Sequence, residues 1–396
     1  MKKFITHWTF AFVTLVVLTY TGLQEPFVKE ILKLKSFDIL IQQEEVELSS
    51  DIGIVTIDEK SIEKYGQWPW KRDVLAQVIT DLRQSGAGVI MIPILFSEED
   101  RLGGDDILTQ TLKDNGVVIA QVGTSQINKN SVPRGVAKIG NPLPYLFEWD
   151  GMLGPIQKLG QNANGVGVIN TAPEIDGVVR RIPLIMRIGE DTYPTMAVEV
   201  IRVATGNPSY QVKAGDGGVQ AIRVPGFPII NTDPNARIWL HWNKTFETIS
   251  AAENDFSKFN GRTVIIGTTA EGLGGIIGTP VGEQYDYMLS ASTLQTMIDG
   301  KQINRYDVSS FLELVLSLVL GIVVILISRF TPYWFVGVGM LSLYGMSVYG
   351  SYYLFNQHLI LSDVSWIIIV ITIVGMHSIF NRFILEFRLK QQIRKQ

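Results

Sequence analysis

The sequence has no cysteine, few histidines and little net charge. Without cysteine, the 396-residue chain cannot form disulfides, thiolate metal sites or a cysteine nucleophile. The four histidines show no HExxH or i, i+4 pairing, and no Ser-His-Asp order with a nucleophile elbow is visible. They are His7, His241, His358 and His377. A formal net charge of −4 is too small to recruit nucleic acid. The composition therefore argues against a zinc enzyme, a hydrolase and a nucleic-acid-binding protein.

What the sequence does contain is long apolar runs. Apolar residues make up 46% of the chain, which suits a soluble fold with membrane segments attached. Spanning a bilayer takes roughly 20 apolar residues. Residues 309–328, 333–355 and 359–380 meet that length, and residues 8–23 are somewhat short. A cleaved signal peptide is the rival interpretation of the first run, but residues 20–24 contain no small-x-small cleavage site. We therefore predict four transmembrane helices.

Lysine and arginine are distributed unevenly around these runs. Lys2 and Lys3 precede the first run, Arg329 lies between the second and third, and the basic segment 381–396 follows the fourth. The connection between the third and fourth runs, residues 356–358, has no lysine or arginine. By the positive-inside rule, both termini are cytoplasmic.

The same rule places a large domain on the other side of the membrane. We expect residues 24–308 to form a periplasmic or extracellular domain and residues 1–7 to be a short cytoplasmic N-terminus. The protein would be a multi-pass protein of the inner (plasma) membrane, with the lipid bilayer as a partner.

The best-defined part of the outside domain is residues 53–72, GIVTIDEKSIEKYGQWPWKR. The apolar run 52–57 predicts a strand in a sheet that is covered on both faces. An acidic pair and a Trp-Pro-Trp turn follow, and residues 73–83 have the apolar spacing of a helix with one buried stripe.

An alternation of strands and helices continues from there. Residues 89–96 predict a second strand that Pro93 interrupts, residues 107–112 a helix and residues 117–122 a third strand. This order predicts an α/β fold with a largely parallel sheet and flanking helices.

The second half of the domain is less regular. Residues 124–159 are rich in Gly, Pro and Asn and predict a long loop. Further helices are predicted at 196–204 and 285–298, and further strands at 166–169, 178–187, 221–224, 229–231, 238–242 and 263–267.

Several ordered blocks resemble the CHASE2 family of bacterial extracytoplasmic sensory domains. The blocks are VTIDEKSIEKYGQWPWKRDVLAQVITDL, ILFSEEDR, GVGVINTAPEIDGVVRRIPL and VIIGTTAEGLGGIIGTPVG. The usual family layout is one span, the sensor outside, three further spans and a cytoplasmic output domain, and this chain has the same order of runs. The family pattern favours Asp, Asp and His at three positions where this chain has Pro93, Gly275 and Ser290, so ligand binding by other members does not transfer directly.

The end of the chain carries a second resemblance. Residues 380–396, FNRFILEFRLKQQIRKQ, are similar to the segment that joins the last span of many CHASE2 proteins to a class III adenylyl cyclase domain. The chain has none of the catalytic residues of such a domain, so we expect the output domain to follow Gln396. Because class III cyclases form their active sites between two subunits, the resemblance implies a homodimer.

Seven side chains of the outside domain have the chemistry to contact an unknown extracytoplasmic ligand. An acidic pair follows a strand, where α/β sheets place ligand groups, although such residues also cap helices. The tryptophans either clasp a ligand or form a packed aromatic corner. The arginine pair binds an anion or forms salt bridges, and the loop with GLGG can cradle an anion. The candidate ligand-binding residues are Asp58, Glu59, Trp68, Trp70, Arg180, Arg181 and Glu271.

We expect no metal, no cofactor and no catalytic residue in this chain. The acidic residues of 98–106 match no EF-hand spacing, so a solvated loop is the simpler interpretation. Glu313 lies in a predicted span and either faces a partner or snorkels to the surface.

The sequence thus predicts a transmembrane sensory module with a cytoplasmic output, first of all a class III adenylate cyclase that makes cAMP. The alternatives are a complete non-enzymatic membrane protein that scaffolds or regulates a partner, the sensor of a histidine kinase or diguanylate cyclase, and an outer-face enzyme or carrier.

Overall fold

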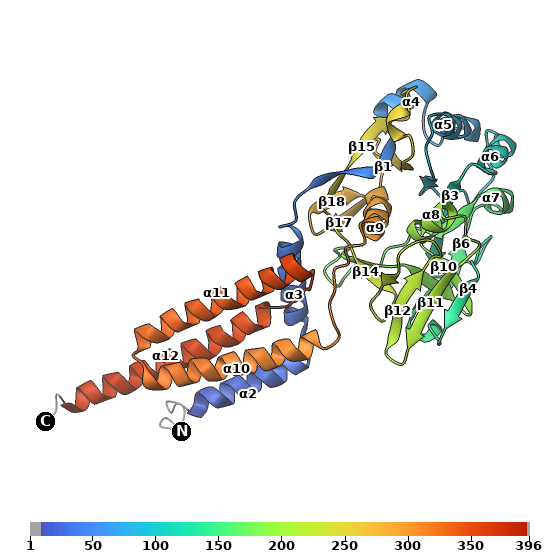
Figure 1. The fold of residues 1–396 in the computed structure, drawn as a ribbon. Helices are drawn as coiled ribbons and strands as arrows, with labels where there is room; N and C mark the ends of the chain where they lie inside the picture. Colours follow the sequence, from blue (N-terminus) through green and yellow to red (C-terminus); the bar gives the residue numbers. More distant parts are fainter. Residues whose placement is uncertain (1–8, 394–396) are drawn as a thin grey trace. The chain divides into compact units, whose positions relative to one another are not determined.

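The computed structural model describes residues 9–393, which form two compact units (Figure 1). One is helical and comprises residues 9–43 and 303–393; the other is an α/β domain, residues 44–302. The predicted N-terminus 1–7, Trp8 and the basic residues Arg394 and Lys395 lie outside the described residues.

A seven-stranded sheet forms the centre of the α/β domain. The strand order is β15-β1-β16-β2-β3-β6, and β7 also pairs with β3. Every pairing is parallel except that of β6 with β3, which confirms the predicted largely parallel sheet. The strands are β1 (Glu47–Ile57), β2 (Ile90–Ile92), β3 (Val117–Thr124), β6 (Gly151–Leu153), β7 (Gly165–Val168), β15 (Lys244–Ser250) and β16 (Thr263–Thr268).

Helices cover both faces of this sheet. A short helix, α4 (Glu59–Tyr65), follows β1. Three helices pack on one face: α5 (Arg72–Gln84), α6 (Asp105–Leu112) and α7 (Gln157–Asn162). On the other face α8 (Met196–Ala204) contacts β7, β3 and β2, and α9 (Tyr287–Asp299) contacts β16 and β1. The mixed α/β prediction is therefore confirmed as a three-layer arrangement.

The apolar pattern explains the burial of both faces of β1. Alternate residues of a strand point to opposite faces. Val55 and Ile57 join the core beneath α5, to which Leu75, Ile79 and Leu82 contribute from the helix. Ile52 and Ile54 point to the opposite face of the strand and are also buried, on the face that carries α9.

Smaller sheets surround the main one. Their strands pair as β10-β9-β5, β13-β12-β11-β4, β14-β8 and β17-β18. The bounds are β4 (Val136–Ile139), β5 (Phe147–Glu148), β8 (Arg181–Pro183), β9 (Ile185–Ile188), β10 (Asp191–Pro194), β11 (Tyr210–Gly215), β12 (Gly218–Arg223), β13 (Ile230–Asn231), β14 (Arg237–Trp239), β17 (Ile276–Thr279) and β18 (Gly282–Tyr285), with 3-10 turns η1 (Leu143–Tyr145) and η2 (Ser257–Phe259).

Two predictions in this region are wrong. The predicted strand 178–187 is divided between β8 and β9, which belong to different sheets, because Pro183 cannot donate a ladder hydrogen bond and Leu184 N bonds to Ala236 O instead. The predicted loop 124–159 contains β4, β5, β6 and α7.

The helical unit is built from α2 (Thr9–Leu23), α3 (Phe27–Ile41), α10 (Ser309–Phe330), α11 (Tyr333–His358) and α12 (Ser365–Ile393). Within it α10 packs against α2, α11 and α12 (Figure 1). Glycines allow close approach: a Cβ at Gly321 would lie 2.4 Å from Leu15, and one at Gly375 would lie 2.3 Å from Met340. Small residues at such contacts are typical of packed membrane helices.

The prediction of four spans is supported only in part. Among residues 9–393, α10 and α12 are long and apolar enough to cross a membrane. Helices α2 and α3 meet at a 77° bend and give a third candidate only if together they form one broken span. The 26-residue α11 is long enough, but it includes five tyrosines, four glycines and three serines, which make it less apolar. Two or three spans are therefore indicated.

Glu313, the acidic residue of α10, has a partner. Both its carboxylate oxygens accept from Arg305, at 2.7 and 2.9 Å, and Asp363 N also donates to it at 2.7 Å. Glu313 was predicted either to face a partner or to snorkel to the surface. The structure supports the partner, because the ion pair with Arg305 is bidentate and satisfies both carboxylate oxygens.

Candidate functional site

The carboxyl edge of the parallel sheet brings several predicted site residues near one another. Asp58 directly follows β1 and begins α4. Its carboxylate accepts from Ser61 N at 3.0 Å, and Ser61 Oγ in turn accepts from Asp58 N, which forms a capping box. Ser250 Oγ, at the end of the neighbouring β15, donates to Asp58 at 2.6 Å. Asp58 is therefore occupied as a helix cap.

The hydrogen bonds also set the charge of this carboxyl group. Burial alone would raise the pKa of Asp58, but the bonds from Ser250 and Ser61 outweigh it and hold the pKa below its ordinary value. Asp58 therefore remains ionised at the sheet edge.

Glu59 and Glu271 meet at the same edge. Glu59 Oε1 accepts a hydrogen bond from Glu271 N at 2.9 Å, which joins the start of α4 to the GLGG loop after β16. Both residues are exposed. Two candidate motifs that are far apart in the sequence thus lie next to each other in the fold, and their carboxylates are accessible from solvent.

Trp68 and Trp70 form an aromatic corner beside this edge. Trp70 is 6% exposed, packs edge-on against Tyr65 and Trp68, and donates from Nε1 to Gly66 O at 2.8 Å. Trp68 is half-buried and, with Pro69, lines one wall of a groove of ≈ 580 Å³. Residues 94–102, which follow β2, line the other wall. Trp70 is thus mainly structural, and Trp68 is placed to contact a ligand.

The groove is lined by aromatic side chains and by charged residues of both signs. Arg72 is buried at its floor, where its guanidinium binds the Asp105 carboxylate and the Glu98 carbonyl and lies 5.4 Å from the Phe96 ring centre. Glu98 and Glu99 are exposed at the rim. Arg101 lines the same groove and is also exposed, so the groove presents carboxylates and a guanidinium together.

Arg180 and Arg181 are engaged in internal ion pairs. Arg180 is fully buried and donates from both terminal nitrogens to Asp176 at 2.8 Å. Arg181 makes a bidentate pair with Glu174 at 2.7 and 2.8 Å and stacks over Trp239. These contacts favour the structural alternative for the arginine pair, because neither fork is open to an anion.

A family model described as the CHASE2 domain matches residues 10–327. The chain belongs to the CHASE2 family. No curated protein and no solved structure matches it. The CHASE2 domain is a known extracytoplasmic sensory domain, and the match includes the whole α/β unit together with α2, α3 and most of α10.

The three positions at which the sequence resemblance suggests a departure from the family pattern lie near the same sheet edge. Pro93 follows β2, Gly275 lies in the loop after β16, and Ser290 is in the first turn of α9. A Cβ at Gly275 would come 2.5 Å from Asp286 Oδ2, so an aspartate there would crowd a second carboxylate. Burial already raises the pKa of Asp286. Glycine leaves this carboxyl group without a charged neighbour at position 275.

A second groove in the CHASE2 domain was not predicted. It measures ≈ 570 Å³ and is lined by amides and a hydroxyl together with Arg134. Arg134 lies 3.3 Å from the buried Glu199, which Arg202 also binds at 2.8 and 2.9 Å. Two guanidinium groups thus share one carboxylate, which favours an anionic group in this groove. Its lining comes from residues 130–134, within the segment predicted as a loop, and from residues 157–164, in and after α7.

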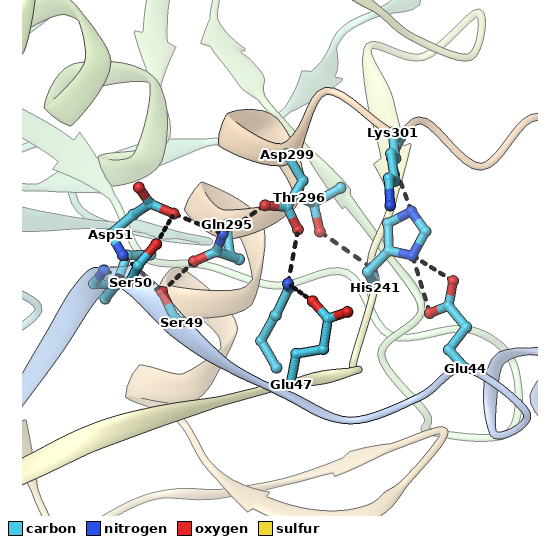
Figure 2. A network of polar contacts seen from close by, with 12 residues as sticks. Glu44, Glu47, Ser49, Ser50, Asp51, His241, Gln295, Thr296, Asp299 and Lys301 are labelled. Carbon is cyan, nitrogen blue, oxygen red and sulfur yellow. Dashed lines mark hydrogen bonds and ion pairs between the residues drawn. The ribbon is translucent and has the colours of Figure 1, made fainter.

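A third feature lies where the α/β unit begins and ends. The ring of His241 lies between Glu44, at the start of the domain, and Lys301, near its end (Figure 2). Ser49 Oγ of β1 also donates to Gln295 of α9 at 2.6 Å. His241 belongs to no sequence motif, because its partners are far away in the chain.

The described residues of the CHASE2 chain show no candidate metal centre. Across residues 9–393, no group of three or more histidine and carboxylate side chains is placed to hold an ion. Residues 98–106 instead bind one another and the backbone, as when Asp105 accepts from Asp100 N at 3.0 Å.

Proposed function

We propose that this chain is a transmembrane sensory module that detects an extracytoplasmic signal and passes it through the membrane helices to a cytoplasmic output. The CHASE2 match over residues 10–327 is the observation that carries the proposal. Signal binding is assigned to the carboxyl edge of the sheet, at Trp68, Glu59 and Glu271, because α/β folds bind ligands at this edge.

Helix α12 is the proposed route to the output. It continues from Ser365 to Ile393 without a break, from its apolar part into the basic segment. A continuous helix can transmit a shift or a rotation along its length, whereas a flexible linker would absorb it. Both termini would be cytoplasmic, as the lysine and arginine distribution predicts.

A class III adenylate cyclase that makes cAMP is our first candidate for the output, and a homodimer is the matching assembly. The resemblance of residues 380–396 to the cyclase run-in supports this choice. A histidine kinase, a diguanylate cyclase or a separate partner protein would use the same helix in the same way.

The test uses the protein together with its output domain. Trp68→Ala should change cAMP output by altering the proposed ligand groove. The effect should persist when Phe387 and Arg388 are replaced by two alanines, and it should disappear with two glycines. The glycines cost about 1 kcal/mol each in helix stability without changing the helix length.

Two results would count against this proposal. An equal effect of Trp68→Ala in the alanine and glycine backgrounds would exclude transmission through a rigid α12. Absence of cAMP from every variant, including the parent, would exclude a cyclase output and favour the kinase, diguanylate cyclase or partner alternatives.

A further inference from the structure

His241 is buried between two hydrogen-bond acceptors. Its ring Nδ1 lies 2.7 and 2.9 Å from the two carboxylate oxygens of Glu44, and its Nε2 lies 2.8 Å from the backbone oxygen of Lys301 (Figure 2). His241 is 6% exposed, so water cannot easily replace either partner. Its backbone N–H is fixed as well, by donation to Thr296 Oγ1 at 3.1 Å.

Two acceptors on one imidazole call for two N–H donors. A neutral histidine ring carries one N–H and one lone pair, whereas the protonated ring donates from both nitrogens. With the neutral ring, one of the two contacts would set a lone pair against a carboxylate or carbonyl oxygen. The geometry therefore matches the protonated ring, with Glu44 as its counter-ion.

The two acceptors belong to the two segments by which the sensory domain joins the rest of the chain. Glu44 is the first residue of the α/β unit, and Lys301 is next to its last residue, Gln302. His241 itself lies between β14 and β15. One side chain thus ties the incoming segment to the outgoing segment.

Neighbouring polar contacts connect this point to the sheet and to α9. Lys244 lies 2.5 Å from Glu47 and 3.9 Å from Asp299, and Gln295 Nε2 donates to Asp299 at 2.7 Å and lies 3.4 Å from Asp51 (Figure 2). The titratable groups of the ring and of this neighbouring network are therefore Glu44, Glu47, Asp51, Asp299, Lys244 and Lys301. Among them, the Glu44 carboxylate contacts the imidazole directly, at 2.7 Å, which makes it the counter-ion of the ring.

We propose that protonated His241 is a clamp that holds the entry and exit segments of the sensory domain together, and that loss of its proton opens the clamp. The direction of this pH dependence follows from the contacts of the ring. Both hydrogen bonds need the ring to carry two N–H groups, so the clamp is complete at lower pH, where the ring is protonated, and is lost at higher pH, where one ring nitrogen has no hydrogen. The inference deepens the proposed function, since the clamped segments are those that would pass on the signal.

The test measures the distance between these segments in the full-length protein in lipid nanodiscs. Because the chain has no cysteine, Glu45→Cys and Lys301→Cys provide the only two sites for spin labels. Lys301→Cys keeps the backbone oxygen that accepts from the ring. Measurements at about pH 6 and about pH 8.5 lie on either side of the ordinary histidine pKa of about 6.5.

A narrow distance distribution is expected at pH 6, with loss of the narrow component at pH 8.5. His241→Gln should lose the narrow component at both pH values, and His358→Gln, which changes a histidine outside the clamp, should behave like the parent. Nitrogen NMR with labelled histidine should show two protonated ring nitrogens at pH 6 in a signal that His241→Gln removes.

A distance that is the same at both pH values in the parent would overturn the proposal, as would a single protonated ring nitrogen at pH 6. If His241→Gln fails to fold, the distances of the parent at the two pH values and its nitrogen NMR signal still test the proposal. None of these readouts depends on the output domain, so a failure here leaves the sensory role intact, and a failure of the cAMP test leaves the clamp intact.

Discussion

Asp58 illustrates how much a single residue can be understood from its local sequence. Its capping role needs only Ser61, three residues later, and this was one of the two predicted alternatives. The bond from Ser250 could not be predicted, because it depends on the parallel pairing of β1 with β15. His241 shows the same limit, since Glu44 is 197 positions away from it.

We expect Asp58→Ala to lower the free energy of unfolding by about 1 kcal/mol, the usual cost of losing an N-cap. The reason is that Ser61 N and Ser250 Oγ lose their acceptor. Urea unfolding followed by tryptophan fluorescence measures the change, and Glu63→Ala, at an exposed position of the same helix, is the matched control.

The pH dependence of this effect has a definite sign. Because the pKa of Asp58 is lowered in the folded state, its contribution is present above the ordinary aspartate pKa and is lost as the pH falls through the lowered value. The stability difference between Asp58→Asn and the parent should therefore shrink in acid. A difference that grew in acid would contradict this account.

At the scale of elements, strongly patterned segments were predicted well. The strand 52–57 and the helix 73–83 lie within β1 and α5, because their apolar spacing matches the burial they have in the fold. The strand β15 was missed, since Lys244–Ser250 pairs only at the edge of the sheet and has no continuous apolar run. The helix α4 was missed because it is only seven residues long and mostly exposed.

Leu82 provides the test of the α5 interface. The side chain is fully buried against the sheet, and Leu82→Ala should lower the free energy of unfolding by about 2–5 kcal/mol, through lost burial and the cavity left behind. Gln84→Ala, in the exposed last turn of α5, should change it by less than about 0.5 kcal/mol. Equal losses for both variants would show that α5 does not pack as described.

At the scale of the whole molecule, the fold class was predictable and the number of spans was not. Strand and helix alternation predicts the three-layer domain that the structure has. The short α2 and the tyrosine-rich α11 lie near the limits of length and apolarity, so the sequence alone does not decide whether they cross a bilayer. The candidate site at the carboxyl edge was predictable in outline, since β1 leads directly to Asp58 and Glu59, whereas the grooves depend on contacts between distant segments.

The most direct test determines on which side of the membrane the sensory domain lies. Arg223→Cys is exposed on β12, and Lys390→Cys is exposed near the end of α12. In intact cells, a membrane-impermeant maleimide should label position 223 and should reach position 390 only after lysis. Labelling of position 390 in intact cells, or protection of position 223, would contradict an extracytoplasmic sensor with a cytoplasmic output helix.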